Sequence, residues 1–233
     1  MEKTAKTTPA VPVHLGVIMD GNRRWAKDQG VTYEQAYQKG IEVLRMVVRQ
    51  AADAGTRFVT AFTFSHENWN RPKEEVTLLM RLLKMYMEKK VRELHKENVR
   101  FKVIGRLKDF SDMMQRVIHD AVALTAANTG ITLTLALNYG GQTELVDAVN
   151  ALVEKNSGEI TPEDIQKHLY DPEQPPVDLI IRTSGEQRTS GFLLWESAYA
   201  ELFFLQKNWP ALAVEDITLA YSDFAQRKRN FGS

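Results

Sequence analysis

Near its amino end the sequence reads His14-Leu15-Gly16-Val17-Ile18-Met19-Asp20-Gly21-Asn22-Arg23-Arg24-Trp25-Ala26, where an apolar run stops abruptly at an Asp-Gly pair. The apolar part has the length of a strand, and the residues after the arginines read as the start of a helix. A carboxylate, the backbone N–H groups of a helix start and cationic side chains together suit a diphosphate bound with Mg²⁺. The alternative is an ordinary strand–turn–helix connection with solvated arginines.

Composition bounds the class of protein. The chain has 233 residues, 43% of them hydrophobic, which is enough for one sizeable core. Its 30 basic and 30 acidic residues give no basic excess of the kind that marks nucleic-acid binders. It contains no cysteine, so disulfides and thiolate metal sites are excluded.

No apolar run is long enough for a transmembrane segment, and the first residues lack the apolar core of a signal peptide. We therefore expect a cytoplasmic protein. Residues 1–12 are predicted to be a flexible tail, and residues 13–233 to form a single domain.

Hydrophobic periodicity alternates between strand and helix along the whole chain. Strands are predicted at 13–19, 58–64, 99–104, 131–137, 177–181 and 202–205. Helices are predicted at 41–51, 76–94, 113–127, 143–155, from 161, and at 214–228. This alternation predicts an α/β fold with a central, mostly parallel six-stranded sheet flanked by helices.

Polar clusters follow the predicted strands. They comprise Asp20, residues 65–71, Asn138 and residues 182–190. Because ligands of parallel sheets bind beyond the carboxyl ends of the strands, we expect these four clusters to meet at one edge. The chain has neither G-x-G-x-x-G after its first strand nor a P-loop, and its five histidines lack metal-ligand spacing, so nucleotide-binding and His-metal sites are not indicated.

The stretch 14–26 resembles the signature of the cis-prenyltransferases, the undecaprenyl diphosphate synthase-like enzymes. In that family a strand ends in Met-Asp-Gly-Asn, with Arg-Trp-Ala close behind, and the resemblance extends over residues 13–232. It implies a catalytic domain over residues 13–233, with a hydrophobic tunnel between sheet and helices. It also implies that an allylic diphosphate ionises beside Mg²⁺ and is attacked by the double bond of a second prenyl diphosphate.

The resemblance assigns roles around the first motif. Asp20 and Asn22 are expected to be catalytic, with Asp20 a ligand of Mg²⁺. The neighbouring residues expected to bind substrate are Gly21, Arg23, Arg24 and Trp25. Glu201 matches a glutamate that contributes to the metal site across a dimer, so a homodimer is expected.

Two further clusters match the family. In the stretch 64–72, Ser65, Asn68 and Arg71 match residues that position the acceptor and carry off its proton, a relay that needs no strong base. The substrate-binding residues expected beside them are Thr63, His66 and Trp69, of which Trp69 is also expected to brace the loop. In the stretch 182–190, the residues expected to grip the diphosphate of isopentenyl diphosphate are Arg182, Arg188 and Ser190; taken alone, this loop could equally hold structural salt bridges.

The chain departs from the long-chain pattern just after the first motif. Tyr33 and the pair Ala36-Tyr37 stand where long-chain members carry an arginine and a Gly-His pair, and we expect Tyr33 and Tyr37 to bind substrate. The helix 76–94 is rich in Leu and Met, which would shorten the tunnel if these side chains point inward; they could equally be ordinary core residues. The expected reaction joins dimethylallyl or geranyl diphosphate to a second C5 unit, giving a short isoprenoid diphosphate.

Three alternatives remain. The departures also fit a head-to-middle coupling of two allylic diphosphates, as in lavandulyl-type relatives. A long-chain undecaprenyl-type synthase is the second alternative. A non-catalytic partner subunit is the third, although such subunits typically lose the metal-binding aspartate and the arginines that this chain keeps.

Overall fold

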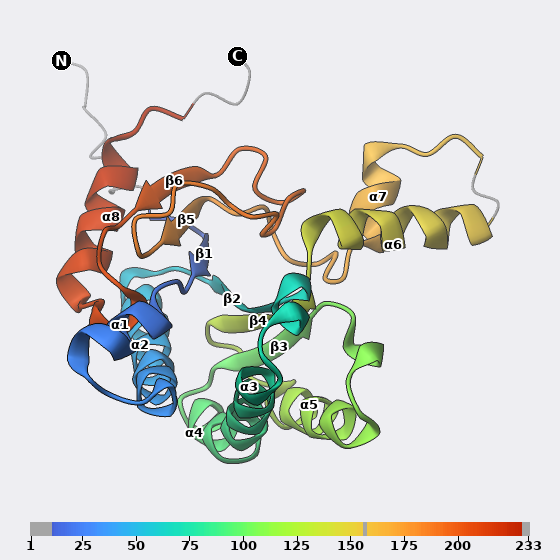
Figure 1. The fold of residues 1–233 in the computed structure, drawn as a ribbon. Coiled ribbons are helices and arrows are strands. Elements are labelled where there is room, and N and C mark those ends of the chain that lie inside the picture. The colour runs from blue at the N-terminus through green and yellow to red at the C-terminus, as the bar shows by residue number, and fades with distance from the viewer. Residues whose placement is uncertain (1–10, 156–157, 230–233) are drawn as a thin grey trace, which may run out of the picture.

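The computed structural model describes residues 11–155 and 158–229. Its strands are β1 His14–Ile18, β2 Phe58–Ser65, β3 Arg100–Ile104, β4 Thr132–Tyr139, β5 Leu179–Arg182 and β6 Glu201–Phe204. They form one six-stranded sheet in the order β3-β4-β2-β1-β5-β6, in which every neighbouring pair is parallel (Figure 1). The predicted α/β class and the six strands are thereby confirmed.

The helices are α1 Asn22–Gln29, α2 Tyr33–Ala54, α3 Lys73–Met85, α4 Val91–Lys96, α5 Asp112–Thr125, α6 Gly141–Glu154, α7 Pro162–His168 and α8 Val214–Gln226. The predicted helix 76–94 is divided into α3, a π-helical turn η2 (Tyr86–Lys90) and α4. The prediction also placed the start of α2 too late. Thr32 and Gln35 form a capping box there, so the helix begins at Tyr33.

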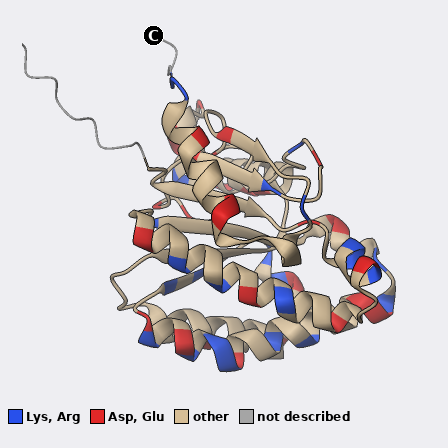
Figure 2. Ribbon diagram, turned by 90° about the vertical axis from the view of Figure 1, so that its left-hand side faces the viewer, with Lys and Arg blue, Asp and Glu red and all other residues tan. Residues whose placement is uncertain are grey.

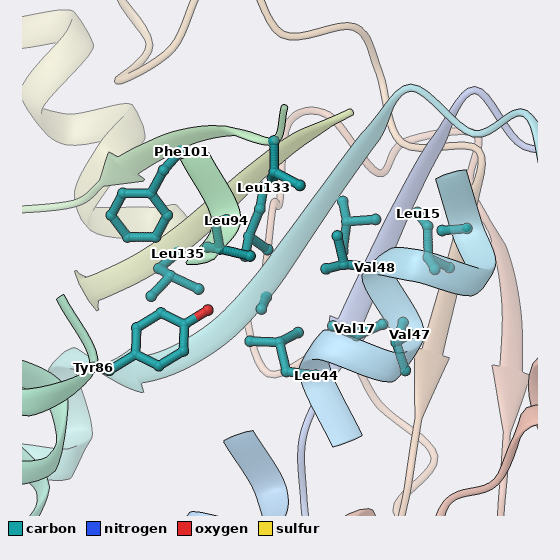
Figure 3. Packing of buried hydrophobic residues seen from close by; sticks show 14 of the residues in the cluster. Leu15, Val17, Leu44, Val47, Val48, Tyr86, Leu94, Phe101, Leu133 and Leu135 are labelled. Carbon is teal, nitrogen blue, oxygen red and sulfur yellow. The ribbon is translucent and has the colours of Figure 1, made fainter. Parts of the chain in front are cut away.

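The sheet is buried on both faces, as parallel sheets are. Val17 belongs to the main core, which α2, α3, α4, α5 and α8 cover (Figures 1 and 3), whereas the next residue, Ile18, belongs to a smaller core on the other face. Alternation along β1 therefore divides its side chains between the two cores. Phe192 and Leu193 cover the second core, and α6 and α7 lie beyond the carboxyl end of β4.

Strand β1 lies between β2, which follows it in the chain, and β5, which comes much later. The chain runs from β1 to β2 on one side, whereas β5, which the chain reaches from β4, is added on the other side of β1. The strand order therefore reverses at β1, which makes its carboxyl end the switch point where ligands of such sheets bind. Asp20 lies two residues beyond that end.

The amino-terminal tail prediction is partly wrong. Residues 1–10 lie outside the described residues, but Pro12 is buried and its carbonyl accepts a hydrogen bond of 2.8 Å from the Thr56 hydroxyl. The N–H of Val13 donates to Asp178 Oδ2 at 2.8 Å. These contacts attach the chain to residues that precede β2 and β5, at the amino ends of the strands. The domain therefore begins before Val13.

Basic and acidic residues alternate along the outer helices (Figure 2), in keeping with the equal numbers of each in the sequence. Several form ion pairs, such as Arg45 on α2 with Glu93 and Glu97 beside α4. Within residues 11–155 and 158–229, none of the helices has both the length and the apolar character that spanning a membrane requires.

Replacing Gly105 by alanine is expected to lower the free energy of unfolding by about 3 kcal/mol. Gly105 follows β3 with φ +120°, and a Cβ there would overlap the carbonyl oxygen of Leu137. Urea denaturation measures the loss. Gly55→Ala is the matched control, because Gly55 has φ +100° but open space around its Cβ position, so only the backbone term of about 1 kcal/mol applies. Equal losses in both variants would contradict the steric explanation.

Candidate active site

A cavity of about 1100 Å³ opens at the carboxyl edge of the sheet. It is lined by residues from β1, α1, α2, β2, the start of α6 and the loop after β5. Three of the four polar clusters predicted to meet at this edge do so: Asp20, residues 65–71 and residues 182–190. The fourth, Asn138, does not line the cavity, because its side chain is buried and is used in hydrogen bonds with Trp69 and Asp109. The predicted site residues that line it are Asp20, Gly21, Asn22, Arg23, Arg24, Tyr33, Tyr37, Thr63, Ser65, Asn68, Arg71, Arg182, Arg188 and Ser190.

Four predicted site residues do not line this cavity: Trp25, His66, Trp69 and Glu201. Trp69 Nε1 donates to Asn138 Oδ1 at 2.8 Å, and His66 Nδ1 lies 3.2 Å from the same oxygen. Both side chains brace the loop after β2 against the end of β4. Trp25 is half-buried on α1.

Glu201 lies at the other edge of the sheet. It opens β6 and pairs in register with Leu179, which pairs with Leu15 near the start of β1. Glu201 is therefore level with Leu15 along the strand direction. Asp20 lies five residues further along the chain than Leu15, which at about 3.3 Å per residue is roughly 17 Å along the strand. Glu201 accepts a 2.7 Å ion pair from Arg227 instead. Within one chain, Asp20 and Glu201 are therefore not brought together.

Arg182 holds the centre of the site. Its side chain is 5% exposed, and Nε and Nη2 donate to Asp20 Oδ2 at 2.9 and 2.8 Å. Its Nη1 donates to Ser190 Oγ at 2.9 Å and to the carbonyl oxygen of Arg188. Burial and the fork geometry of the guanidinium fix the orientation of both Asp20 and Ser190. Both contacts of Asp20 use Oδ2, which leaves Oδ1 for a ligand.

The turn after β1 is held by backbone and side-chain contacts. Gly21 caps α1 with φ +99°, and the Asn22 amide donates to the Met19 carbonyl at 2.9 Å. The Thr183 hydroxyl donates to the Asp20 carbonyl at 2.7 Å. The amino end of α1 thus faces the cavity, where its N–H groups favour an anion.

Glu186 pairs with two arginines of the cavity. Its Oε1 accepts from Arg24 at 2.6 Å and its Oε2 pairs with Arg188 at 2.7 Å. Arg24 also donates to Ser184 Oγ at 2.6 Å. Hydrogen bonds from Arg24 and then Arg188 lower the pKa of the Glu186 carboxyl. The carboxylate therefore neutralises part of the positive charge that these two arginines bring to the cavity.

Glu186→Gln is expected to tighten the binding of inorganic pyrophosphate about threefold, because both arginines lose their internal counter-charge while their exposure keeps the effect small. Isothermal titration calorimetry gives the affinity. Glu42→Gln on α2, which removes the same charge from a pair with Lys39, is the control. An equal gain in both variants would show an effect of net charge alone.

A second carboxylate, Glu75, organises the opposite wall of the cavity. Its side chain is 5% exposed and accepts from Arg71 at 2.9 Å and from the Tyr37 hydroxyl at 3.0 Å. Arg23 Nη1 lies 3.4 Å from its other oxygen, and the Arg23 guanidinium lies 5.5 Å from the centre of the Tyr33 ring. Burial, with the charge of Glu75, raises the pKa of Tyr37 to about 12, so the phenol stays a donor.

Sequence reasoning missed Glu75 and Glu186. An acidic residue in the first turn of a helix is ordinary helix-dipole chemistry, and Glu75 occupies that position in α3. The one available signal was its spacing of four residues from Arg71, which fits a helical ion pair. Glu186 lay inside the predicted arginine loop, but its partner Arg24 is distant in sequence.

A smaller apolar pocket of about 120 Å³ adjoins the cavity between β2, α2 and α3. The residues that line both are Met19, Asn22, Tyr37, Phe62, Thr63 and Leu79. Its inner wall is apolar and comes from α2, α3, β2 and β4, through Leu44, Leu83, Phe64 and Leu135. Tyr86 also lines this pocket. A polar mouth therefore leads into an apolar recess.

Comparison with known proteins decides the family. The family model described as "Putative undecaprenyl diphosphate synthase" matches residues 18–232. The chain belongs to this family. A "Ditrans,polycis-undecaprenyl-diphosphate synthase ((2E,6E)-farnesyl-diphosphate specific)" of Haemophilus ducreyi is 44% identical over 239 residues, which cover 100% of this chain and 99% of that one. An "Isoprenyl transferase" of Rickettsia bellii is 43% identical over 219 residues, 94% of this chain and 97% of the relative.

A solved structure also resembles this member of the undecaprenyl diphosphate synthase family. The lavandulyl diphosphate synthase of Lavandula x intermedia, solved with dimethylallyl diphosphate, has a TM-score of 0.90 and 33% identity, covering 96% of this chain and 99% of that one. The resemblance found in the sequence is thereby confirmed. The chain is a cis-prenyltransferase.

Proposed function

We propose that this prenyltransferase makes a short isoprenoid diphosphate by joining dimethylallyl or geranyl diphosphate to isopentenyl diphosphate, with release of diphosphate. The apolar pocket of about 120 Å³ carries the proposal. A dry cavity of about 150 Å³ holds one benzene molecule, so this pocket has room for about one isoprene unit beyond the polar mouth. A long polyprenyl chain needs many times that volume.

The reaction assigns a task to each wall of the cavity. The C–O bond of the allylic diphosphate breaks, and the electron pair leaves with the diphosphate, whose charge meets Arg24 and the amino end of α1. The double bond of isopentenyl diphosphate attacks the cation and forms the new C–C bond. A proton is then lost to a diphosphate oxygen, beside Ser65, Asn68 and Arg71.

The Asp20 carboxylate has the properties expected of a Mg²⁺ ligand. Its Oδ1 is open to the cavity, its side chain is 39% exposed, and Mg²⁺ binds through one or two carboxylates together with substrate phosphates and water. Among the described residues no group of three acidic or histidine side chains is preassembled. The ion would supply charge neutralisation of the leaving diphosphate.

The same proposal includes a homodimer. Glu201 lies at the far edge of the sheet from Asp20, so it could join a metal site only from another chain. Helix α6 carries an exposed apolar stripe of Val146, Val149 and Val153, exposed by 54, 38 and 60%, at the spacing of one helix face. Sedimentation at micromolar concentration measures the state, and a species of 26.6 kDa would contradict the dimer.

A head-to-middle coupling of two allylic diphosphates is the second candidate, because the similar lavandulyl diphosphate synthase was solved with dimethylallyl diphosphate. One experiment separates the candidates. The pure protein is incubated with Mg²⁺ and dimethylallyl diphosphate, with and without isopentenyl diphosphate, and the alcohols are identified after phosphatase treatment.

A short linear product that requires isopentenyl diphosphate supports the main proposal. Product from dimethylallyl diphosphate alone supports the second candidate. Long polyprenols would contradict the short-chain proposal and match the activity named for the Haemophilus relative. Absence of any product, with Asp20→Asn behaving as the parent does, would favour a non-catalytic subunit.

A further inference from the structure

Two side chains that line the apolar pocket have a buried polar atom without a hydrogen-bond partner among the described residues: Asn22, through Oδ1, and Tyr86, through its hydroxyl. Asn22 also lines the polar cavity, whereas Tyr86 lines the apolar pocket and not the cavity. Tyr86 lines the pocket and is 3% exposed, yet its hydroxyl has no hydrogen-bond partner among the described residues. Figure 3 shows the hydroxyl pointing into the cluster, on the side of Leu135 and Leu44, which both line the same pocket.

The backbone places Tyr86 there by a local irregularity. Helix α3 ends at Met85, and the turn Tyr86–Lys90 is π-helical. Core-facing residues recur at 82, 83, 86 and 87, and a regular α-helix would next turn residue 90, a lysine, inward. The extra residue of the π-helical turn shifts the inward position from residue 90 to residue 91. The Lys90 side chain is therefore 43% exposed and Val91 is buried, and the core-facing side of the helix continues after Tyr86 and Met87.

An unpartnered hydroxyl in an apolar wall is unfavourable, and native structures rarely keep one unless something satisfies it. A phenol is also large, so its ring occupies volume that an aliphatic residue of the wall would leave open. The hydroxyl can donate weakly to the π face of a carbon–carbon double bond, the one acceptor that a prenyl chain offers.

We propose that Tyr86 is the specificity-determining residue for product length: its ring closes the inner end of the pocket, and its hydroxyl donates to the terminal double bond of the bound chain. The inference rests on the proposed function, since it concerns the prenyl chain held in this pocket. It gives the ring and the hydroxyl separate roles, which separate variants can test.

The variants are Tyr86→Ala, Tyr86→Leu and Tyr86→Phe, with Met87→Ala as the matched control. Met87 is equally buried in the same π-helical turn but does not line the pocket. Two measurements are made on each purified full-length variant whose fold is verified by circular dichroism. One is the product length from dimethylallyl and isopentenyl diphosphates, and the other is the affinity for geranylgeranyl diphosphate as a binding probe.

Tyr86→Ala is expected to lengthen the product by one or two isoprene units and to bind the probe at least about tenfold more tightly than the parent, because more of the chain is buried. Tyr86→Leu is expected to give a product length and a probe affinity between those of the parent and of Tyr86→Ala. It replaces Tyr86→Ala in the test if the alanine variant does not fold. Tyr86→Phe is expected to keep the product length and to raise the KM of the allylic substrate about threefold. Met87→Ala is expected to match the parent.

Unchanged product length and probe affinity in both Tyr86→Ala and Tyr86→Leu would overturn the inference. Equal lengthening by Met87→Ala would also overturn it, because a looser helix would then be the cause. An unchanged KM in Tyr86→Phe would overturn the role of the hydroxyl. Failure of the proposed function is distinguishable, since it shows in the parent as long products or none, while the probe still reports on the pocket.

Discussion

Asp20→Asn is expected to lower kcat by about 10³-fold, since losing one preorganised group that stabilises developing charge lowers rates by about 10²–10³-fold and the proposed Mg²⁺ ligand is lost with it. The substitution keeps the size of the side chain and an oxygen that accepts from Arg182, so the fold of the site should remain. What disappears is the negative charge with which Asp20 would hold the proposed Mg²⁺. Product formation at saturating substrate gives kcat.

A binding measurement makes the role of Asp20 independent of turnover. In the parent, Mg²⁺ should tighten the binding of inorganic pyrophosphate, and in Asp20→Asn most of that gain should be absent. Asp28→Asn is the matched control, because Asp28 lies on the same helix α1 but does not line the cavity, and its carboxylate accepts a hydrogen bond from the Asn208 amide at 3.3 Å. A rate for Asp20→Asn within tenfold of the parent would contradict both the catalytic and the metal-binding assignment.

The sheet was predictable because its determinants are local. Each strand is an apolar run of strand length, and the helices between them force parallel pairing. The cavity followed from the same logic, since the carboxyl ends of parallel strands share an edge. Asp20 and Arg182 follow different strands far apart in sequence, and they meet in an ion pair of 2.8 Å.

The partners inside the site were not predictable, because they depend on side chains meeting across elements. Glu75 joins Arg71, Tyr37 and Arg23 from separate segments, and no single sequence window contains that set. The π-helical turn at Tyr86 was hidden for another reason. The extra residue of the turn makes Val91 face the core in place of Lys90, while the apolar pattern of the sequence around it still predicts a helix.

A pair of buried carboxyls away from the cavity makes stability depend on pH. Glu196 is 7% exposed, and its Oε2 has no hydrogen-bond partner among the described residues. Burial, with the nearby charges of Glu144 and Asp171, raises the pKa of Glu196 from 4.5 to about 8. Burial likewise raises the pKa of Glu144, which accepts hydrogen bonds from the Tyr139 hydroxyl and the Tyr170 N–H.

The sign follows from which state holds the proton. Between pH 4.5 and about 8 the unfolded chain releases the proton of Glu196 while the folded chain keeps it, so the free energy of unfolding falls as pH rises through this window and levels off above it. Each unit of difference is worth about 1.4 kcal/mol, and the two carboxyls share the effect, so the loss at pH 9 is on the order of 3 kcal/mol.

Glu196→Gln removes that ionisation while keeping the shape of the side chain, so the variant should be more stable than the parent by about 3 kcal/mol at pH 9 and nearly equal to it at pH 4.5. Urea denaturation across the range gives both curves. Glu154→Gln, an exposed change near the end of the same helix α6 that carries Glu144, should leave the slope unchanged. Parallel curves for the parent and Glu196→Gln would show that Glu196 ionises normally in the folded protein, and hence that its carboxyl reaches water despite its burial.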